Sequence, residues 1–185
     1  MKDNKLVLYR RKREGRTNYK KRLTLLKSRK PRIVIRRTNT QMLVQITEYA
    51  PDGDKVIVGV NSNELKKLGW QYSCNNMPAC YLAGILVGKK AKAKKVTEAI
   101  ADFGLQSNIP HSKLYAVIKG AIDAGLTIPA DPEVFPKKER LTGAHIADYF
   151  SKSKGKNQFV DYKKKNLNVS NIAADAEGLK KKILQ

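Results

Sequence analysis

The stretch NMPACYLAGILVGKKAKAKK, residues 76–95, decides the fold because it predicts a long helix that must be buried on most sides. Asn76 and Pro78 suit a helix start, and the closing lysines suit the negative end of a helix. Its first half is apolar all round and carries small residues that allow close packing: Ala79, Ala83, Gly84 and Gly88. We predict that this is the central helix of the core.

Three segments upstream of this helix are rich in Val and Ile, as β-strands are. They are Arg32–Arg37, Gln41–Tyr49 and Lys55–Val60. The joins at Thr38–Thr40 and Pro51–Gly53 have turn-forming composition. We therefore predict an antiparallel meander of three strands with one face buried.

Downstream, Glu98–Phe103 predicts a further strand, and regular apolar spacing after Ser112 predicts a helix that ends before Gly125. Because strands and helices alternate after an antiparallel start, the predicted fold class is α/β, a compact mixed sheet packed with helices. Prolines mark the end of this part, at Pro129, Pro132 and Pro136.

The sequence predicts three parts, namely a basic N-terminal arm at 1–30, an α/β core domain at 31–130 and a helical C-terminal extension with a basic tail at 131–185. Within the extension we expect an amphipathic helix over Glu139–Phe150, although Gly143 weakens it. A linker is expected over Ser151–Asn157, and a terminal helix of marginal stability over Asn171–Leu184.

The charge of the chain is strongly positive, with 38 basic and 16 acidic residues and a formal net charge of +22. Residues 1–30 hold thirteen basic and two acidic side chains, whereas residues 39–150 hold thirteen and eleven. A nearly neutral body thus carries basic ends, which indicates a polyanionic partner. Nucleic acid is the leading candidate, and an anionic membrane is the alternative.

The distribution of apolar residues along the chain argues against the membrane alternative. The longest apolar run, Ala79–Gly88, is about half of what a bilayer needs, and the charged N-terminus lacks the apolar region of a signal peptide. Residues 9–22 contain no Leu, Ile, Val or Phe, so they offer no apolar stripe to a membrane surface. We expect a cytoplasmic protein with no membrane partner.

The sequence also gives little support to catalysis, since it has no phosphate-binding glycine loop and no nucleophile elbow. Cys74 and Cys80 lack the spacing of a zinc site. The carboxylates that could serve a two-metal nuclease are Glu48, Asp102, Asp123 and Asp148, and nothing in their spacing aims them at one another. We predict no enzyme, metal or cofactor, with a metal-dependent RNA-processing enzyme as the alternative.

The arm sequence YRRKREGRTNYKKR, residues 9–22, contains five arginines and three lysines. The guanidinium group binds phosphate in a bidentate way and stacks on bases, and Tyr9 and Tyr19 can stack as well. The arm has two basic clusters, and the turn-forming residues between them are Gly15, Thr17 and Asn18. This pattern favours folded RNA over a solubilising tail, while a general RNA chaperone stays possible.

Three stretches, Tyr9–Tyr19, Gly69–Ala91 and Ala116–Pro129, resemble the large-subunit ribosomal protein L-eighteen family in its archaeal and eukaryotic-like form. With HIA at His145–Ala147, the resemblance covers most of residues 5–150. It implies a compact α/β domain without catalysis, located in the cytoplasmic ribosome. The implied partners are 5S rRNA, the adjoining 23S-type rRNA and neighbouring ribosomal proteins, and the implied role is attaching 5S rRNA to the large subunit in the central protuberance.

The same resemblance implies RNA contacts mainly on the arm, at Arg10, Arg11, Lys12, Arg13, Arg16, Thr17, Asn18, Tyr19, Lys20 and Arg22. To these we add three strand residues placed beside the arm: Arg32, Arg36 and Arg37. The lysine cluster Lys89–Lys95 is a secondary candidate.

Overall fold

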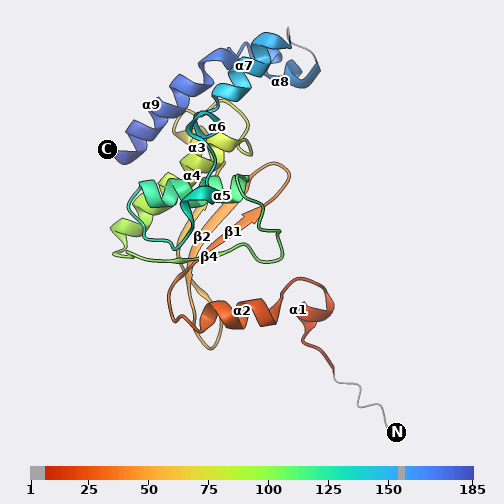
Figure 1. The fold of residues 1–185 in the computed structure, drawn as a ribbon, viewed down its shortest axis with the longest axis vertical. Helices are drawn as coiled ribbons and strands as arrows, with labels where there is room; N and C mark the ends of the chain where they lie inside the picture. Colours follow the sequence, from red (N-terminus) through yellow and green to blue (C-terminus); the bar gives the residue numbers. More distant parts are fainter. Residues whose placement is uncertain (1–6, 154–156) are drawn as a thin grey trace.

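A computed structural model describes residues 7–153 and 157–185 of the chain (Figure 1). Residues 1–6 of the predicted arm and 154–156 of the predicted linker lie outside the described residues. A central layer of strands carries helices on one side, and the basic arm lies at one end of the long axis.

The sheet contains β1 (Arg32–Arg37), β2 (Met42–Glu48), β3 (Lys55–Asn61) and β4 (Ile100–Asp102), in the order β3-β2-β1-β4. Strands β1, β2 and β3 form the predicted antiparallel meander, and β4 pairs with β1 in parallel. The predicted mixed sheet is confirmed. Its parallel edge results from the helical crossover between β3 and β4.

Alternation along the strands gives the sheet two unlike faces. One face is apolar and fully buried, with Ile33, Ile35, Val44 and Ile46 among its residues. The residues between them, including Arg32, Val34, Arg36 and Gln45, point to the opposite face, which the arm partly covers.

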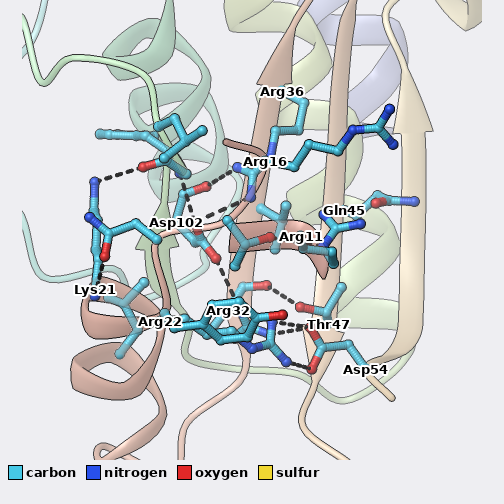
Figure 2. Close-up of a pocket in the computed structure, with 18 of the residues that line it drawn as sticks. Arg11, Arg16, Lys21, Arg22, Arg32, Arg36, Gln45, Thr47, Asp54 and Asp102 are labelled. Atoms are coloured by element: carbon cyan, nitrogen blue, oxygen red, sulfur yellow. Dashed lines mark hydrogen bonds and ion pairs between the residues drawn. The ribbon is translucent and has the colours of Figure 1, made fainter. Parts of the chain in front are cut away.

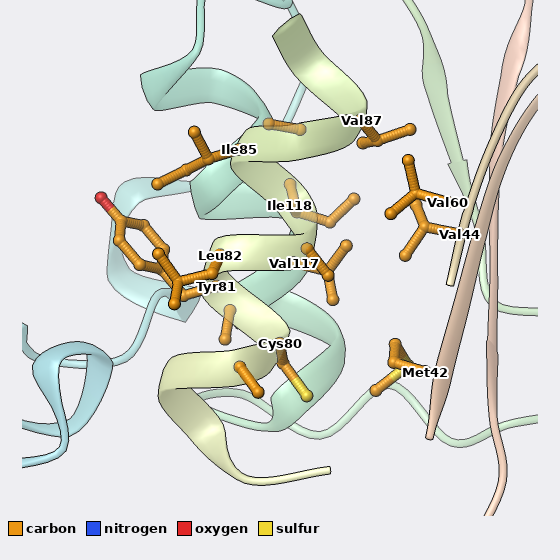
Figure 3. Packing of buried hydrophobic residues seen from close by; sticks show 14 of the residues in the cluster. Met42, Val44, Val60, Cys80, Tyr81, Leu82, Ile85, Val87, Val117 and Ile118 are labelled. Carbon is orange, nitrogen blue, oxygen red and sulfur yellow. The ribbon is translucent and has the colours of Figure 1, made fainter. Parts of the chain in front are cut away.

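Helices α4 (Met77–Ala93) and α5 (Lys113–Asp123) cover the apolar face, and Figure 3 shows Val87 and Val117 turned toward β2 and β3. The two helices touch through their backbones, since a Cβ added at Gly84 would lie 2.1 Å from the carbonyl oxygen of Val117. Gly88 lies against Ala124 in the same way, so the helices run in the same direction.

Two short elements, α3 (Glu64–Lys67) and η1 (Pro132–Val134), and a capped start of α4 connect these layers. Helix α3 follows β3, and its Glu64 carboxylate accepts a hydrogen bond from the Asn61 N–H at 2.9 Å, as a capping residue does. At the start of α4, Asn76 Oδ1 accepts from the Ala79 N–H at 2.9 Å. The 3-10 helix η1 lies in the proline-rich segment that leaves α5.

The C-terminal extension begins with α6 (Lys138–Thr142) and α7 (Ala144–Lys152). The prediction of one helix over Glu139–Phe150 is wrong, because Gly143 adopts a left-handed conformation with φ of +92° and separates the two. A glycine reaches this conformation without the steric cost of a Cβ, so it ends one helix and lets the next change direction.

The extension continues through η2 (Asn157–Phe159), α8 (Val160–Lys164) and η3 (Val169–Asn171) to α9 (Ile172–Leu184). Helix α9 packs on α4 and buries one face, with Ile172, Ala176, Leu179 and Ile183. Core packing thus supplies the stability that an isolated helix of this length would lack. Among the described residues, no helix is long and apolar enough to span a membrane.

Candidate nucleic-acid interface

The arm folds into two short helices, α1 (Arg10–Arg13) and α2 (Tyr19–Leu26). Between them the chain turns at Gly15, whose φ is +63°, and α2 begins where Asn18 Oδ1 accepts from the Lys21 N–H at 3.0 Å. The Tyr9 and Tyr19 rings lie 5.3 Å apart between centroids. The turn-forming residues and the two tyrosines therefore give the arm a defined shape.

Between the arm and the open face of the sheet lies a groove of about 690 Å³, which we call the arm groove (Figure 2). Six cationic side chains line it: Arg11, Arg16, Lys21, Arg22, Arg32 and Arg36. Neutral polar groups accompany them, at Thr17, Asn18, Gln45 and Gln106. The groove thus combines positive charge with hydrogen-bond donors and acceptors, as a phosphate-rich ligand requires.

The floor of the arm groove is organised by Arg32, whose side chain is only 2% exposed. Its guanidinium donates to Asp102 at 2.8 Å and also to Asp54. A buried guanidinium loses several kcal/mol of hydration, so it is tolerated where carboxylates face it. The Arg32 side chain therefore ties β1 to β4 and to the turn before β3.

Asp54 also binds the arm. Arg22 of α2 donates to both of its carboxylate oxygens, at 2.8 and 2.7 Å. This hydrogen bonding holds the pKa of Asp54 below its ordinary value, although partial burial opposes the shift, and the pKa of Arg22 is raised in turn. A bidentate pair fixes orientation as well as distance, so α2 is docked at a defined angle.

The loop after β4 provides a second docking point. Asp102 Oδ1 accepts from the Gly104 N–H at 2.8 Å, and Lys21 Nζ donates to the Gly104 carbonyl at 3.1 Å. Arg36 donates to the Asp102 carbonyl at 2.9 Å, which leaves its 41% exposed side chain held along the groove wall. The arm is thus attached to the sheet at two places.

The structure places the predicted contact residues in different roles. Lys12, Arg13 and Lys20 are exposed, and their side chains make no hydrogen bond or ion pair within residues 7–153 and 157–185. Arg10 and Arg16 are exposed and share Glu14, at 3.6 and 3.2 Å. Arg11 donates to Thr17 at 2.8 Å. The tip of the arm therefore offers cations with weak or no internal partners.

The three predicted strand residues are placed differently around the arm groove, and their contact with RNA stays a prediction. Arg32 lines the floor with a side chain that is only 2% exposed and is paired with Asp54 and Asp102, so it has a positioning role. Arg37 is exposed, but strand alternation turns it away from Arg36 and toward the helix side of the sheet. Arg36 lines the groove with a partly exposed side chain that a phosphate could reach.

Sequence reasoning missed Lys21, Asp54 and the positioning role of Asp102. A carboxylate inside an otherwise apolar strand was the available signal for Asp102, because such a group needs a buried partner. Asp54 gives no comparable signal, since it follows a turn in which an acidic residue is ordinary. Its function depends on Arg22 and Arg32, which only the fold brings to it.

Two of the four carboxylates considered for two-metal chemistry are paired with other side chains, on opposite sides of the sheet. Asp102 faces Arg32 and Arg36, while Asp123 on the opposite side of the sheet accepts from Tyr81 at 2.7 Å and pairs with Lys119. Across the described part of the chain, no three His, Cys, Asp or Glu side chains gather in a way that could hold a metal ion.

Comparison with known proteins shows which family carries this basic site. The family described as "Ribosomal large subunit proteins 60S L5, and 50S L18" matches residues 5–98. "Large ribosomal subunit protein uL18" of Korarchaeum cryptofilum (strain OPF8) is 44% identical over 181 residues, which cover 96% of this chain and 93% of the relative. The chain belongs to the uL18 family.

As a member of the uL18 family, the chain is a constituent of the large ribosomal subunit and not an enzyme. Its place in the cell is the ribosome of the cytoplasm, where ribosomal RNA and other ribosomal proteins surround it. The predicted family and the absence of an enzymatic role are confirmed by this relationship.

Proposed function

We propose that this uL18-family protein binds 5S rRNA through the arm and the arm groove, and helps attach it to the 23S-type rRNA in the central protuberance. The observation that carries the proposal is a cationic arm held by ion pairs over a polar groove of about 690 Å³. Such a concave surface complements the rounded backbone of folded RNA better than a flat patch does.

Affinity would come mainly from phosphate contacts on the arm tip. Lys12, Arg13 and Lys20 are exposed, so a phosphate can approach them without displacing an internal partner. Each phosphate contact releases counterions, which makes binding depend steeply on salt. Tyr9 and Tyr19 add aromatic faces beside these cations, where an unstacked base could lie.

Specificity would come from the shape of the arm. Arg22 and Asp54 dock α2 before any RNA arrives, so less conformational entropy is lost when the complex forms. The arginines of the groove then stand at fixed distances from one another. Folded RNAs with a different backbone spacing would satisfy fewer of them.

The test measures binding to 5S rRNA and to a tRNA across a salt series, for the wild type and for Lys12→Ala/Arg13→Ala/Lys20→Ala. We expect 5S rRNA to bind more tightly at every salt concentration, and the triple variant to lower the salt slope by about 2–3. The matched control, Lys164→Ala/Lys165→Ala/Lys181→Ala, removes the same charge from exposed positions in the C-terminal extension and should keep the wild-type slope. Equal affinity for both RNAs would instead identify a general RNA chaperone.

A further inference from the structure

A second basic surface lies at the amino-terminal ends of α4 and α5, in a cavity of about 410 Å³ that we call the helix-start corner. Asn76 at the start of α4 and Lys113 at the start of α5 both line it, and Arg140 and His145 reach it from α6 and α7. The cavity shares no lining residue with the arm groove. Figure 1 shows the arm at one end of the long axis and α6 and α7 on the far side of the sheet.

The electrostatics of this corner favour an anion. Because α4 and α5 run in the same direction, the positive ends of both helix dipoles meet here. Neither helix has an acidic residue in its first turn, and α5 begins with Lys113, which is unfavourable at a helix start. Lys113 and Arg140 make no side-chain hydrogen bond or ion pair within the described residues. A bound anion would relieve this repulsion.

Two asparagine amides give the corner a fixed wall. Asn75 Nδ2 donates to the carbonyls of Thr38 and Asn39, at 3.2 and 2.8 Å, and its buried Oδ1 has no partner among the described residues. Asn76 uses Oδ1 to cap α4, and its buried Nδ2 likewise has none. Both atoms are themselves buried, so the role of the two amides is structural: their hydrogen bonds fix the loop and the helix start that form the wall of the corner.

The composition of the lining identifies the chemistry. The corner presents three cationic or titratable donors, three asparagines and a serine, with no carboxylate. Lysine, arginine and asparagine are the side chains that contact RNA phosphates and sugars. In contrast, the cavity of about 490 Å³ between α4, α5 and α9 includes Asp123 and Glu177 beside apolar residues, which suits RNA less well.

We propose that the helix-start corner binds the phosphate backbone of the large-subunit rRNA while the arm groove holds 5S rRNA. The inference rests on the proposed function and adds to it the surface that makes the second attachment. Two basic surfaces that share no lining residue would allow a single protein to hold two RNAs at once. Each surface can therefore be disabled without the other.

The experiment forms the complex with 5S rRNA and then measures its binding to full-length large-subunit rRNA across a salt series. For Lys113→Ala/Arg140→Ala we expect 5S affinity within about twofold of wild type, and a loss of at least about tenfold for the large-subunit rRNA with a salt slope lower by about 2. Arg140→Ala alone changes an exposed side chain and should give part of the same loss. The control Lys164→Ala/Lys165→Ala should change neither affinity.

The outcomes separate the two proposals. Unchanged attachment of the large-subunit rRNA in both corner variants would overturn the inference and leave an acidic protein segment as the occupant. Loss of 5S binding in the corner variants would also overturn it, because the two surfaces would not be independent. If the arm variant Lys12→Ala/Arg13→Ala/Lys20→Ala keeps full 5S affinity, the proposed function fails. The corner proposal is still tested separately, by the affinity of the corner variants for the large-subunit rRNA.

Discussion

The contact between α4 and α5 and the contact between the arm and the sheet are both essential to the fold, but they are built on different principles. The helices meet at Gly84 and Gly120, where each would-be Cβ lies 2.1 Å from a backbone oxygen of the other helix. The arm meets the sheet through Arg22, Arg32 and Asp54. The first contact is specified by volume and cannot accept a methyl group, whereas the second is specified by charge and cannot lose a partner.

The largest effect on stability is expected at Arg32, because its ion pairs are buried. Arg32→Met would leave Asp54 without one partner and the buried Asp102 facing only the more distant Arg36, at a cost of about 3–5 kcal/mol in the free energy of unfolding. Denaturant unfolding measures it. Arg36→Met, two residues along the same strand, removes a 41% exposed side chain and should cost less than about 1 kcal/mol. Equal effects at the two positions would contradict the distinction.

The close packing of α4 and α5 predicts a somewhat smaller loss of stability for a substitution at Gly84. A methyl group there meets the Val117 carbonyl, which belongs to a helix backbone and cannot rotate away, so Gly84→Ala should destabilise by about 3 kcal/mol. Gly178→Ala is the matched control, because α9 leaves open space at that position. It should stabilise by roughly 0.5–1 kcal/mol through helix propensity. A Gly84→Ala variant as stable as the wild type would show that the helices separate at little cost.

The volume-based half of the molecule could be predicted from the sequence. A helix apolar on all sides with four small residues can only lie at the centre, so Met77–Ala93 was identifiable, and so was the Val- and Ile-rich meander. The break at Gly143 was not, because a glycine within an amphipathic pattern is compatible with either a weak helix or a turn. Only the packing of α6 and α7 decides between them.

The charge-based half could be predicted only in part. The density of cations identified the arm, but cations that bind a partner and cations that hold the fold look alike in a sequence. Arg32 pairs with Asp102, 70 positions away, and Arg22 with Asp54, 32 positions away. Local patterns carry no information at such separations. Both arginines were therefore predicted only as RNA contacts, and the fold adds the carboxylates with which they pair.

A smaller effect is expected when the docking of the arm is weakened while the buried Arg32 keeps the charge of Asp102. Asp54→Asn removes one charge from the bidentate pair with Arg22, so amides of α2 should exchange hydrogen faster by a factor that corresponds to about 1–2 kcal/mol. Affinity for 5S rRNA should fall up to about tenfold, since the arm must be ordered on binding. The control Asp52→Asn changes an exposed carboxylate in the same turn and should leave exchange unchanged.

The same ion pair predicts a pH dependence of arm docking. Because the Arg22 hydrogen bonds hold the pKa of Asp54 below its ordinary value, the pair contributes fully above about pH 4. The contribution is lost as the pH falls through the lowered pKa. At the same pH, wild-type α2 should therefore exchange as fast as α2 of the Asp54→Asn variant only in strong acid. Equal exchange rates of the two proteins already at pH 6 would contradict the shift.

The smallest effect, an unchanged labelling rate of Cys80, is expected when only the arm is undocked, and this rate separates the two contacts most directly. Its side chain is fully buried in α4, and burial raises the pKa of the thiol to about 12, so alkylation by iodoacetamide at pH 8 requires the core to open. Peptide mass spectrometry should give the same Cys80 labelling rate in the wild type and in Asp54→Asn, because undocking the arm leaves α4 and α5 together. In Gly84→Ala the rate should rise roughly 100-fold, in line with a loss of about 3 kcal/mol. If Asp54→Asn also accelerated labelling, the arm and the core would open as one unit, and charge would stabilise both contacts.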